Sequence, residues 1–164
     1  MKRCLIALVV LALALSSCSG ASASPTEIMD VLDADLPTGT VYSTNAGGEH
    51  ALTPQLLAIS YDIPLDFDSL EGAAIRFSSF KHPCEIAIFL CKNARAVEDV
   101  TLFCKQRIRN LIENATAFAT LCGMSKEEYT EYVSAGIIVV SGRYVALIIA
   151  PDAKQLKRTF IRKT

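Results

Sequence analysis

Two apolar runs near the C-terminal end place the strongest constraint on the fold of this chain. Residues 137–140 and 143–150 consist mainly of isoleucine, valine, leucine and alanine, and Ser141-Gly142 lies between them. Two β-rich runs joined by a glycine-containing pair are typical of a β-hairpin. Because both runs are almost wholly apolar, we expect central strands that are covered on both faces, or strands with one face against an interface.

A second hairpin is predicted upstream. Between residues 73 and 78 apolar side chains alternate with Arg76 and small residues, which indicates a half-buried strand. Residues 84–91 form the returning strand after a turn at residues 81–83. Its side chains should alternate between two faces, with Ile86, Ile88 and Leu90 on one face and Glu85, Ala87 and Phe89 on the other.

Capping signals place the helices. Ser24-Pro25-Thr26-Glu27 and Ser125-Lys126-Glu127-Glu128 fit capping boxes, and Thr53-Pro54 and Pro151 are further helix starts. Asn93 can cap a long helix that we expect to continue towards Gly123. Its apolar stripe is spaced by three and four residues and consists of Val97, Val100, Cys104, Ile108, Leu111 and Ala115.

These elements predict an α+β fold. We expect an antiparallel sheet of about four strands, made of two hairpins, with helices packed on one face and a helical segment ahead of it. Residues 40–44 fit a short edge strand. Each hairpin precedes a helix, so a degenerate duplication of a β-β-α unit is one interpretation.

The N-terminal residues have the three parts of a secretory signal. Lys2 and Arg3 precede an apolar run at residues 5–15, which is too short to span a bilayer. Leu15-Ser16-Ser17-Cys18 then resembles a bacterial lipobox. We therefore expect a cleaved signal at residues 1–17, and a lipidated Cys18 with a tether up to residue 24. A single extracytoplasmic domain at residues 25–164 should then be attached to the cell membrane by lipid.

Charge and cysteine content narrow the classes of function. The formal net charge is −1, and loss of Lys2 and Arg3 makes it about −3, so the basic excess of a nucleic-acid binder is missing. Cys4 belongs to the signal and Cys18 carries lipid. The remaining four cysteines can form disulfides or stay as buried free thiols. They are Cys84, Cys91, Cys104 and Cys122. Cys84 and Cys91 point to opposite faces of one strand, so they should not bridge each other.

Catalytic and metal-binding motifs are missing from the sequence. It contains no G-x-S-x-G, H-E-x-x-H or C-x-x-C pattern, and His50 and His82 are its only histidines. His82-Pro83-Cys84 brings a histidine and a thiol close in sequence, but on a tight turn. We favour an ordinary turn over catalysis or metal binding there, and we expect no cofactor.

Two charged regions are candidate contact sites. Glu85 begins an otherwise apolar strand, so it could contact a ligand or partner, as could Arg76 and Arg143. The interpretation we favour is structural, with Glu85 in water or in a salt bridge to Arg76 or Arg143 across the sheet. The last helix could rest on anionic lipid headgroups or be a solvated helix end. Its basic residues are Lys154, Lys157, Arg158, Arg162 and Lys163.

Three segments and the lipobox carry a family resemblance. They are residues 85–89, 129–132 and 139–145, and they are similar to small uncharacterised lipoproteins of Gram-positive, Firmicute or Clostridia-type bacteria with a domain of unknown function. That family has no catalytic residues to transfer, so the resemblance implies location and fold alone. We expect a non-catalytic binding or interaction module. An accessory subunit of a membrane complex, a small-ligand or cell-wall-fragment binder, and an enzyme using Cys84 or Cys91 are the alternatives.

Overall fold

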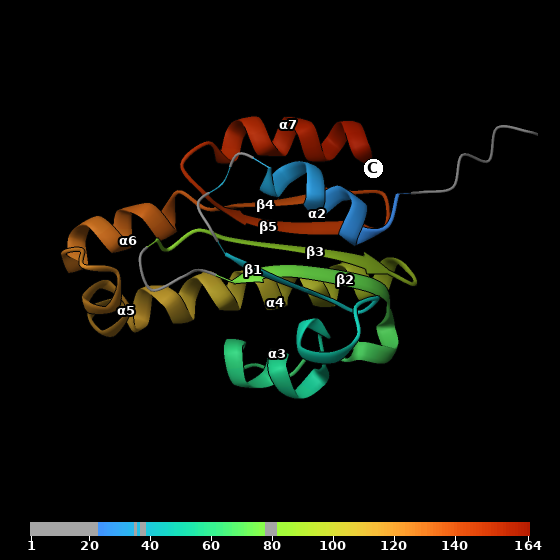
Figure 1. Ribbon diagram of the computed structural model, residues 1–164, viewed down its shortest axis with the longest axis horizontal. Helices are drawn as coiled ribbons and strands as arrows, with labels where there is room; N and C mark the ends of the chain where they lie inside the picture. The colour runs from blue at the N-terminus through green and yellow to red at the C-terminus, as the bar shows by residue number, and fades with distance from the viewer. Residues whose placement is uncertain (1–22, 35, 37–38, 78–81) are drawn as a thin grey trace, which may run out of the picture.

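Five antiparallel strands form one sheet in the computed structural model (Figure 1). The structure describes residues 23–34, 36, 39–77 and 82–164, so the expected signal, Cys18 and most of the tether lie outside the described residues. The spatial order is β1-β2-β3-β5-β4. The strand bounds are β1 Thr40–Ser43, β2 Leu70–Phe77, β3 Glu85–Cys91, β4 Ile137–Ser141 and β5 Tyr144–Ile149. The α+β class and the antiparallel sheet are confirmed, and β1 adds a fifth strand at one edge.

Both predicted hairpins are present. In the first, β2 pairs with β3, and in the second β4 pairs with β5. The second turn is tight, because Ser141 pairs directly with Tyr144 and Gly142 adopts a φ of 55°. The two hairpins join through β3 and β5, which are central to the sheet.

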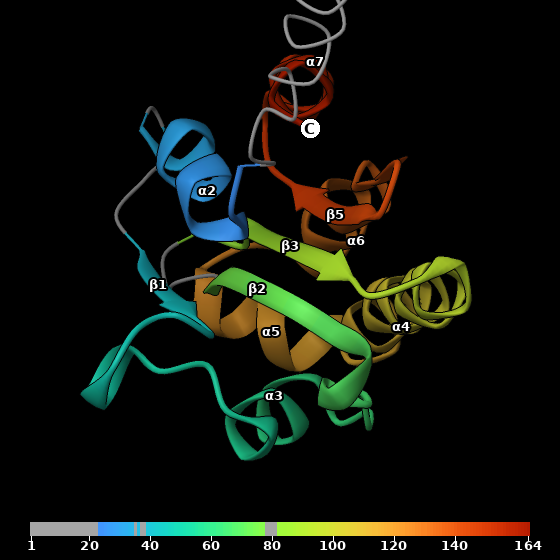
Figure 2. The ribbon, with the colours of Figure 1, turned by 90° about the vertical axis from the view of Figure 1, so that its right-hand side faces the viewer.

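Helices cover both faces of this sheet (Figure 2). One face carries α3 (Pro54–Tyr61), α4 (Ala94–Glu113), α5 (Ala115–Cys122) and α6 (Lys126–Ser134), and the other carries α2 (Pro25–Asp33) and α7 (Ala153–Lys163). The expectation of helices on one face is therefore wrong. Every residue of β3 and β5 is buried. Since strands that are apolar on both sides cannot leave one face in water, a helical layer is needed on each side.

The two faces have separate cores. Ala87, Phe89 and Leu147 point to the α4 side, whereas Ile86 and Ile148 point to the side of α2 and α7. The alternation predicted for β3 is thus confirmed. If the two β-β-α units were copies of each other, a two-fold rotation would exchange the antiparallel strands β3 and β5. The helix that follows each strand would then lie on the same face of the sheet. Because α4 and α7 lie on opposite faces, the arrangement does not support a simple β-β-α duplication.

Local capping chemistry explains where the helices begin. Ser24 with Glu27, and Ser125 with Glu128, form reciprocal capping boxes, and Asn93 accepts a hydrogen bond from the Ala96 amide. The helix expected to run to Gly123 is instead divided at Asn114, where φ and ψ are −98° and 18°.

Among the residues that the structure covers, no helix is both long and apolar enough to cross a membrane.

Candidate functional site

Glu85 is engaged inside the protein. It is 1% exposed and lies on the α4 side of β3. The Arg107 guanidinium donates to both carboxylate oxygens, with Nε to Oε1 at 3.1 Å and Nη2 to Oε2 at 2.7 Å. Arg107 also donates through Nη1 to the Ser60 carbonyl at 2.8 Å, and its guanidinium carbon lies 4.5 Å from the centre of the Tyr61 ring. This bidentate pair therefore ties β3, α4 and the end of α3 together.

The surroundings of this cluster raise the pKa values of Arg107 and Tyr61. Burial disfavours the guanidinium, but the Glu85 carboxylate outweighs it and raises the pKa of Arg107 above its usual value. Burial, followed by the nearby Glu85 charge, raises the pKa of Tyr61 well above its ordinary range. Both oxygens of the Glu85 carboxylate are thus occupied by the Arg107 guanidinium, and the cluster joins three elements of the fold.

Arg76 lies on the opposite face of the sheet. It is 1% exposed, pairs with Asp33 of α2, and donates through Nη1 to the Cys84 carbonyl at 3.0 Å. Gly39 packs directly against it, since a Cβ at that position would lie 2.7 Å from the guanidinium. Arg76 therefore connects β2 with α2 and the start of β3.

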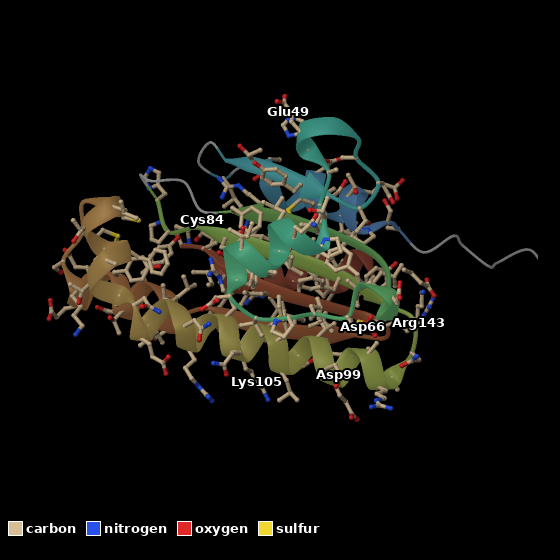
Figure 3. All side chains as sticks on the ribbon, turned by 90° about the horizontal axis from the view of Figure 1, so that it is seen from below. Glu49, Asp66, Cys84, Asp99, Lys105 and Arg143 are labelled. Carbon is tan, nitrogen blue, oxygen red and sulfur yellow. The ribbon has the colours of Figure 1, made fainter. Side chains whose placement is uncertain are left out.

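Arg143 lies at the far end of the sheet, where it pairs with Glu71 and donates to the Cys91 carbonyl at 3.3 Å. Figure 3 shows Cys84 on the left of the view and Arg143 on the right, well separated from each other. The three candidate contact residues Glu85, Arg76 and Arg143 are thus not brought together. The salt bridge predicted from Glu85 to Arg76 or Arg143 is wrong, because one arginine is on the other face and the other is beyond the far end of β3.

Sequence reasoning missed Arg107. A usable signal existed, because Arg107 falls between Cys104 and Leu111 at steps of three and four residues. That spacing places an arginine on the apolar face of a helix, where a buried charge needs a partner. Glu85, the one carboxylate on a strand with otherwise apolar neighbours, was that partner.

The described cysteines are free thiols, with Cys84, Cys91 and Cys104 buried and Cys122 partly exposed. Cys84 and Cys91 lie in the cores of opposite faces, as predicted. Burial raises the pKa of each of the four, to about 11 for Cys91. At neutral pH they are therefore protonated and weakly nucleophilic.

His82 is exposed, and no cluster of metal-ligating side chains is found in the part of the chain that the structure describes.

An open groove lies where β5 turns into α7, and we call it the Pro151 groove. It consists of two adjoining hollows of about 380 and 390 Å³ that share Ala135, Ala150 and Pro151. The α6 wall contributes Glu128, Glu131 and Tyr132, and the α7 wall contributes Lys154, Gln155 and Arg158.

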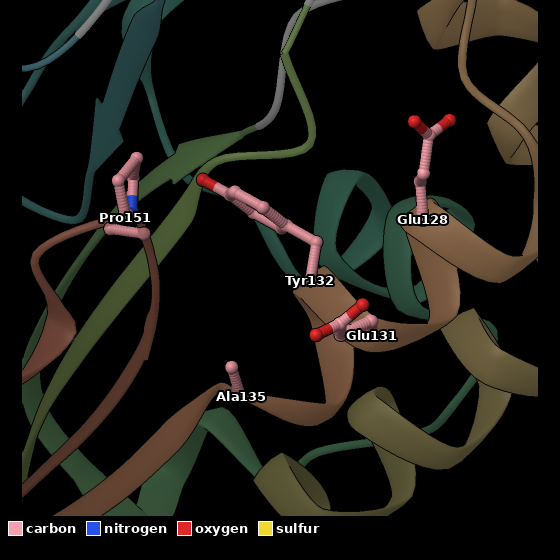
Figure 4. Close-up of a pocket in the computed structure, with 6 residues that line it drawn as sticks. Glu128, Glu131, Tyr132, Ala135 and Pro151 are labelled. Carbon is pink, nitrogen blue, oxygen red and sulfur yellow. The ribbon is translucent and has the colours of Figure 1, made fainter.

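The side chains of the α6 wall differ in orientation. Figure 4 shows the Tyr132 hydroxyl reaching across towards Pro151, while Glu128 points away. Glu128 accepts a hydrogen bond from the Ser125 amide at 2.8 Å as part of its capping box. Glu131 is exposed, so it supplies the accessible negative charge of this wall.

A separate hollow of about 610 Å³ lies between α4 and the segment at residues 63–66, and we call it the α4 groove. Its apolar lining includes Ile63, Leu65, Leu102 and Phe103. Asp66, Asp99 and Lys105, labelled in Figure 3, lie at its charged rim together with Arg109. Its volume is within the range of small-molecule sites.

Comparison of the chain with protein-family models, with curated proteins and with solved structures found no match. The resemblance to small lipoproteins therefore stays a prediction from the sequence segments named above.

Proposed function

We propose that the chain is a lipid-anchored module on the extracytoplasmic face of the cell membrane that binds a partner without transforming it. The Pro151 groove is the observation that carries the proposal. Its α6 wall is acidic, its α7 wall carries Lys154 and Arg158 beside a single carboxylate at Asp152, and its floor is small and apolar. The side chains best suited to catalysis also support a binding function. Glu85 and Arg107 neutralise each other in the core, and the thiols have raised pKa values.

The groove fits an extended peptide segment that carries both charges. Lys154 and Arg158 can receive a carboxylate on the α7 side, and Glu131 can receive an ammonium or guanidinium group on the α6 side. Ala135, Ala150 and Pro151 form a shallow floor that admits a backbone close to the protein surface. An accessory subunit of a membrane complex is one form of such a module.

The position of the groove agrees with an anchored protein. The described chain begins at Ala23, whose carbonyl accepts a hydrogen bond from the Tyr144 hydroxyl at the start of β5. Pro151 follows the other end of β5. The two points are separated by the length of a six-residue strand, about 20 Å. An anchor at Cys18 would thus leave the groove accessible.

Site-directed photo-crosslinking in native membranes tests the groove. A photoreactive residue at Ala135, on the groove floor, should form a discrete adduct, whereas one at the exposed Leu121 should not. Glu131→Lys or Lys154→Glu should remove the Ala135 adduct, and Lys105→Glu on α4 should leave it unchanged. Equal adducts at Ala135 and Leu121, or no adduct at either, would contradict the proposal.

Metabolic labelling with a fatty acid tests the anchor separately. The chain should incorporate the label and sediment with membranes, and Cys18→Ala should lose both properties. If Cys18→Ala keeps its membrane partition and its electrophoretic mobility, the chain is not anchored through this cysteine.

The α4 groove favours a second candidate function, the binding of a small amphiphilic molecule. Leu102 is 61% exposed beside the buried Phe103, so an apolar ligand body could cover both while charged groups meet the rim. Native mass spectrometry of protein extracted from its own membranes should then show a bound mass. Leu102→Glu should abolish that mass and Leu121→Glu should not; a bare protein in every case would exclude this function.

A further inference from the structure

The two ends of the described chain meet at the β4–β5 turn. The Tyr144 hydroxyl donates to the Ala23 carbonyl at 2.6 Å, and the Thr164 hydroxyl hydrogen-bonds to the Ser141 hydroxyl at 2.7 Å. Ser141 and Tyr144 are direct partners in the hairpin. Figures 1 and 2 show the C-terminus close to the first described residues. The end of α7 therefore lies beside the point from which residues 18–22 must depart.

The last two turns of α7 carry a basic surface around an exposed apolar side chain. Lys157, Arg162 and Lys163 are exposed, and Ile161 between them is 48% exposed. We call these four residues the basic end of α7. Phe160, which is fully buried, fixes the helix against the sheet, so the opposite side of the helix faces outwards. Basic side chains around an exposed apolar residue are typical of helices that rest on membrane headgroups.

The neighbouring helix does not neutralise this charge. α2 contacts α7 and carries Glu27, Asp30 and Asp33. Glu27 is engaged in the capping box with Ser24, and Asp33 is paired with Arg76. Asp30 is the remaining carboxylate of α2, against three cations at the basic end of α7.

We propose that the basic end of α7 docks on anionic phospholipid headgroups and orients the domain on the membrane. The inference rests on the proposed function, because it uses the lipid at Cys18. Five peptide units join Cys18 to Ala23, and they span about 17 Å at full extension. A lipid held at that distance keeps the basic end of α7 near the headgroups at a high local concentration. The β4–β5 turn then faces the membrane, and the Pro151 groove lies at the far end of β5.

The test uses the full lipidated protein in two kinds of vesicle, one of phosphatidylcholine alone and one with about a third phosphatidylglycerol. An environment-sensitive fluorophore is attached at Ile161→Cys or, as the matched control, at Leu121→Cys, in a Cys122→Ser background. Both positions are exposed apolar residues, but they lie on opposite faces of the sheet. Flotation of the vesicles reports the anchor, and the fluorophore reports the docking face.

We expect a blue-shifted, brighter emission at position 161 in the anionic vesicles alone, and no change at position 121 in either kind of vesicle. Substitution of Lys157, Arg162 and Lys163 by glutamine should abolish the shift, with a roughly fivefold loss of surface affinity per residue. Lys105→Gln with Arg109→Gln on α4 should retain it. If the protein floats with both vesicles but position 161 does not respond to anionic lipid, the docking proposal is wrong while the anchor stands. If the protein does not float, the anchor itself fails.

Discussion

Two arginines are buried in the part of the chain that the structure describes, one on each side of the sheet, and their surroundings differ. Arg107 enters the α4 side from a helix and meets Glu85, whose side chain is 1% exposed. Arg76 comes from β2 and meets Asp33, whose side chain is 30% exposed. Arg107 also has the face of Tyr61 against its guanidinium, and Tyr61 in turn stacks on Phe103 at 4.9 Å.

The Arg107–Glu85 pair is therefore closed to water, whereas the Arg76–Asp33 pair is open to it on the side of the carboxylate. Water cannot replace either partner of the Arg107 pair, so the removal of one partner leaves a buried charge without compensation. Water can reach the Asp33 carboxylate of the Arg76 pair, so water can replace part of the interaction when that carboxylate is removed. We therefore expect the α4 layer to depend on one specific charge pair, and the layer of α2 and α7 to depend mainly on apolar packing.

The largest expected effect follows from breaking the closed pair. Glu85→Gln should lower the free energy of unfolding by about 3–5 kcal/mol, because Arg107 stays charged in the core. Urea unfolding followed by circular dichroism measures the change. As a control, Glu85→Leu combined with Arg107→Met should recover most of the loss. A double variant as unstable as Glu85→Gln would mean that the pair is not the cause.

The open pair gives the corresponding smaller effect. Asp33→Asn should cost about 1–2 kcal/mol in the same urea experiment, since Arg76 keeps its bond to the Cys84 carbonyl and water can approach from the side of α2. The comparison between the faces fails if this loss equals the loss in Glu85→Gln.

Tyr61→Phe separates the ring from the hydroxyl within the Arg107 cluster. The Tyr61 hydroxyl is buried near the Glu85 carboxylate but makes no hydrogen bond of good geometry, whereas its ring contacts Arg107 and Phe103. We expect a gain of about 0.5–1 kcal/mol for Tyr61→Phe, because a buried unsatisfied group is removed and the ring is retained. Tyr61→Leu, which removes the ring, should lose stability. A clear loss in Tyr61→Phe would show that the hydroxyl bonds to Glu85.

The smallest effect concerns alkaline pH. Burial raises the pKa of Cys91 on the α4 side from 9.0 to about 11. The unfolded thiol therefore releases its proton at lower pH than the folded thiol, and stability should fall as the pH rises from about 9 to 11. Thermal unfolding across this range should show a shallower decline in Cys91→Ala than in the unsubstituted protein. An unchanged slope would exclude a contribution from this thiol.

Features determined by neighbouring residues were predictable from the sequence. The capping boxes at Ser24 and Ser125 and the turn at Ser141-Gly142 need residues only a few positions apart. The alternation of side chains over residues 73–78 and 84–91 predicted the first hairpin, and the Ser141-Gly142 turn predicted the second. The division of the long helix at Asn114 was missed, because the apolar stripe continues across it.

Features that depend on distant residues were not predictable in the same way. The presence of Arg76 in β2 led us to predict a half-buried strand. The strand is almost wholly buried instead, because Asp33 neutralises Arg76 and α2 covers that face. Glu85 and Arg107 are 22 residues apart, and only packing of α4 on the sheet joins them. The Pro151 groove combines α6 and α7, which are separated by a hairpin, so spacing alone could not indicate it.

The pairing of β3 with β5 has a consequence for the order of folding. Leu90 and Tyr144 are neighbours in the sheet although more than fifty residues of chain, including α4, α5, α6 and β4, lie between them. Closing so long a segment costs roughly 2 kcal/mol more in chain entropy than closing a local turn, because the cost grows with the logarithm of loop length. The two hairpins should therefore form early, and their union at the centre of the sheet should limit the folding rate. Pulse-labelling hydrogen exchange would then find protection within each hairpin before it appears between β3 and β5.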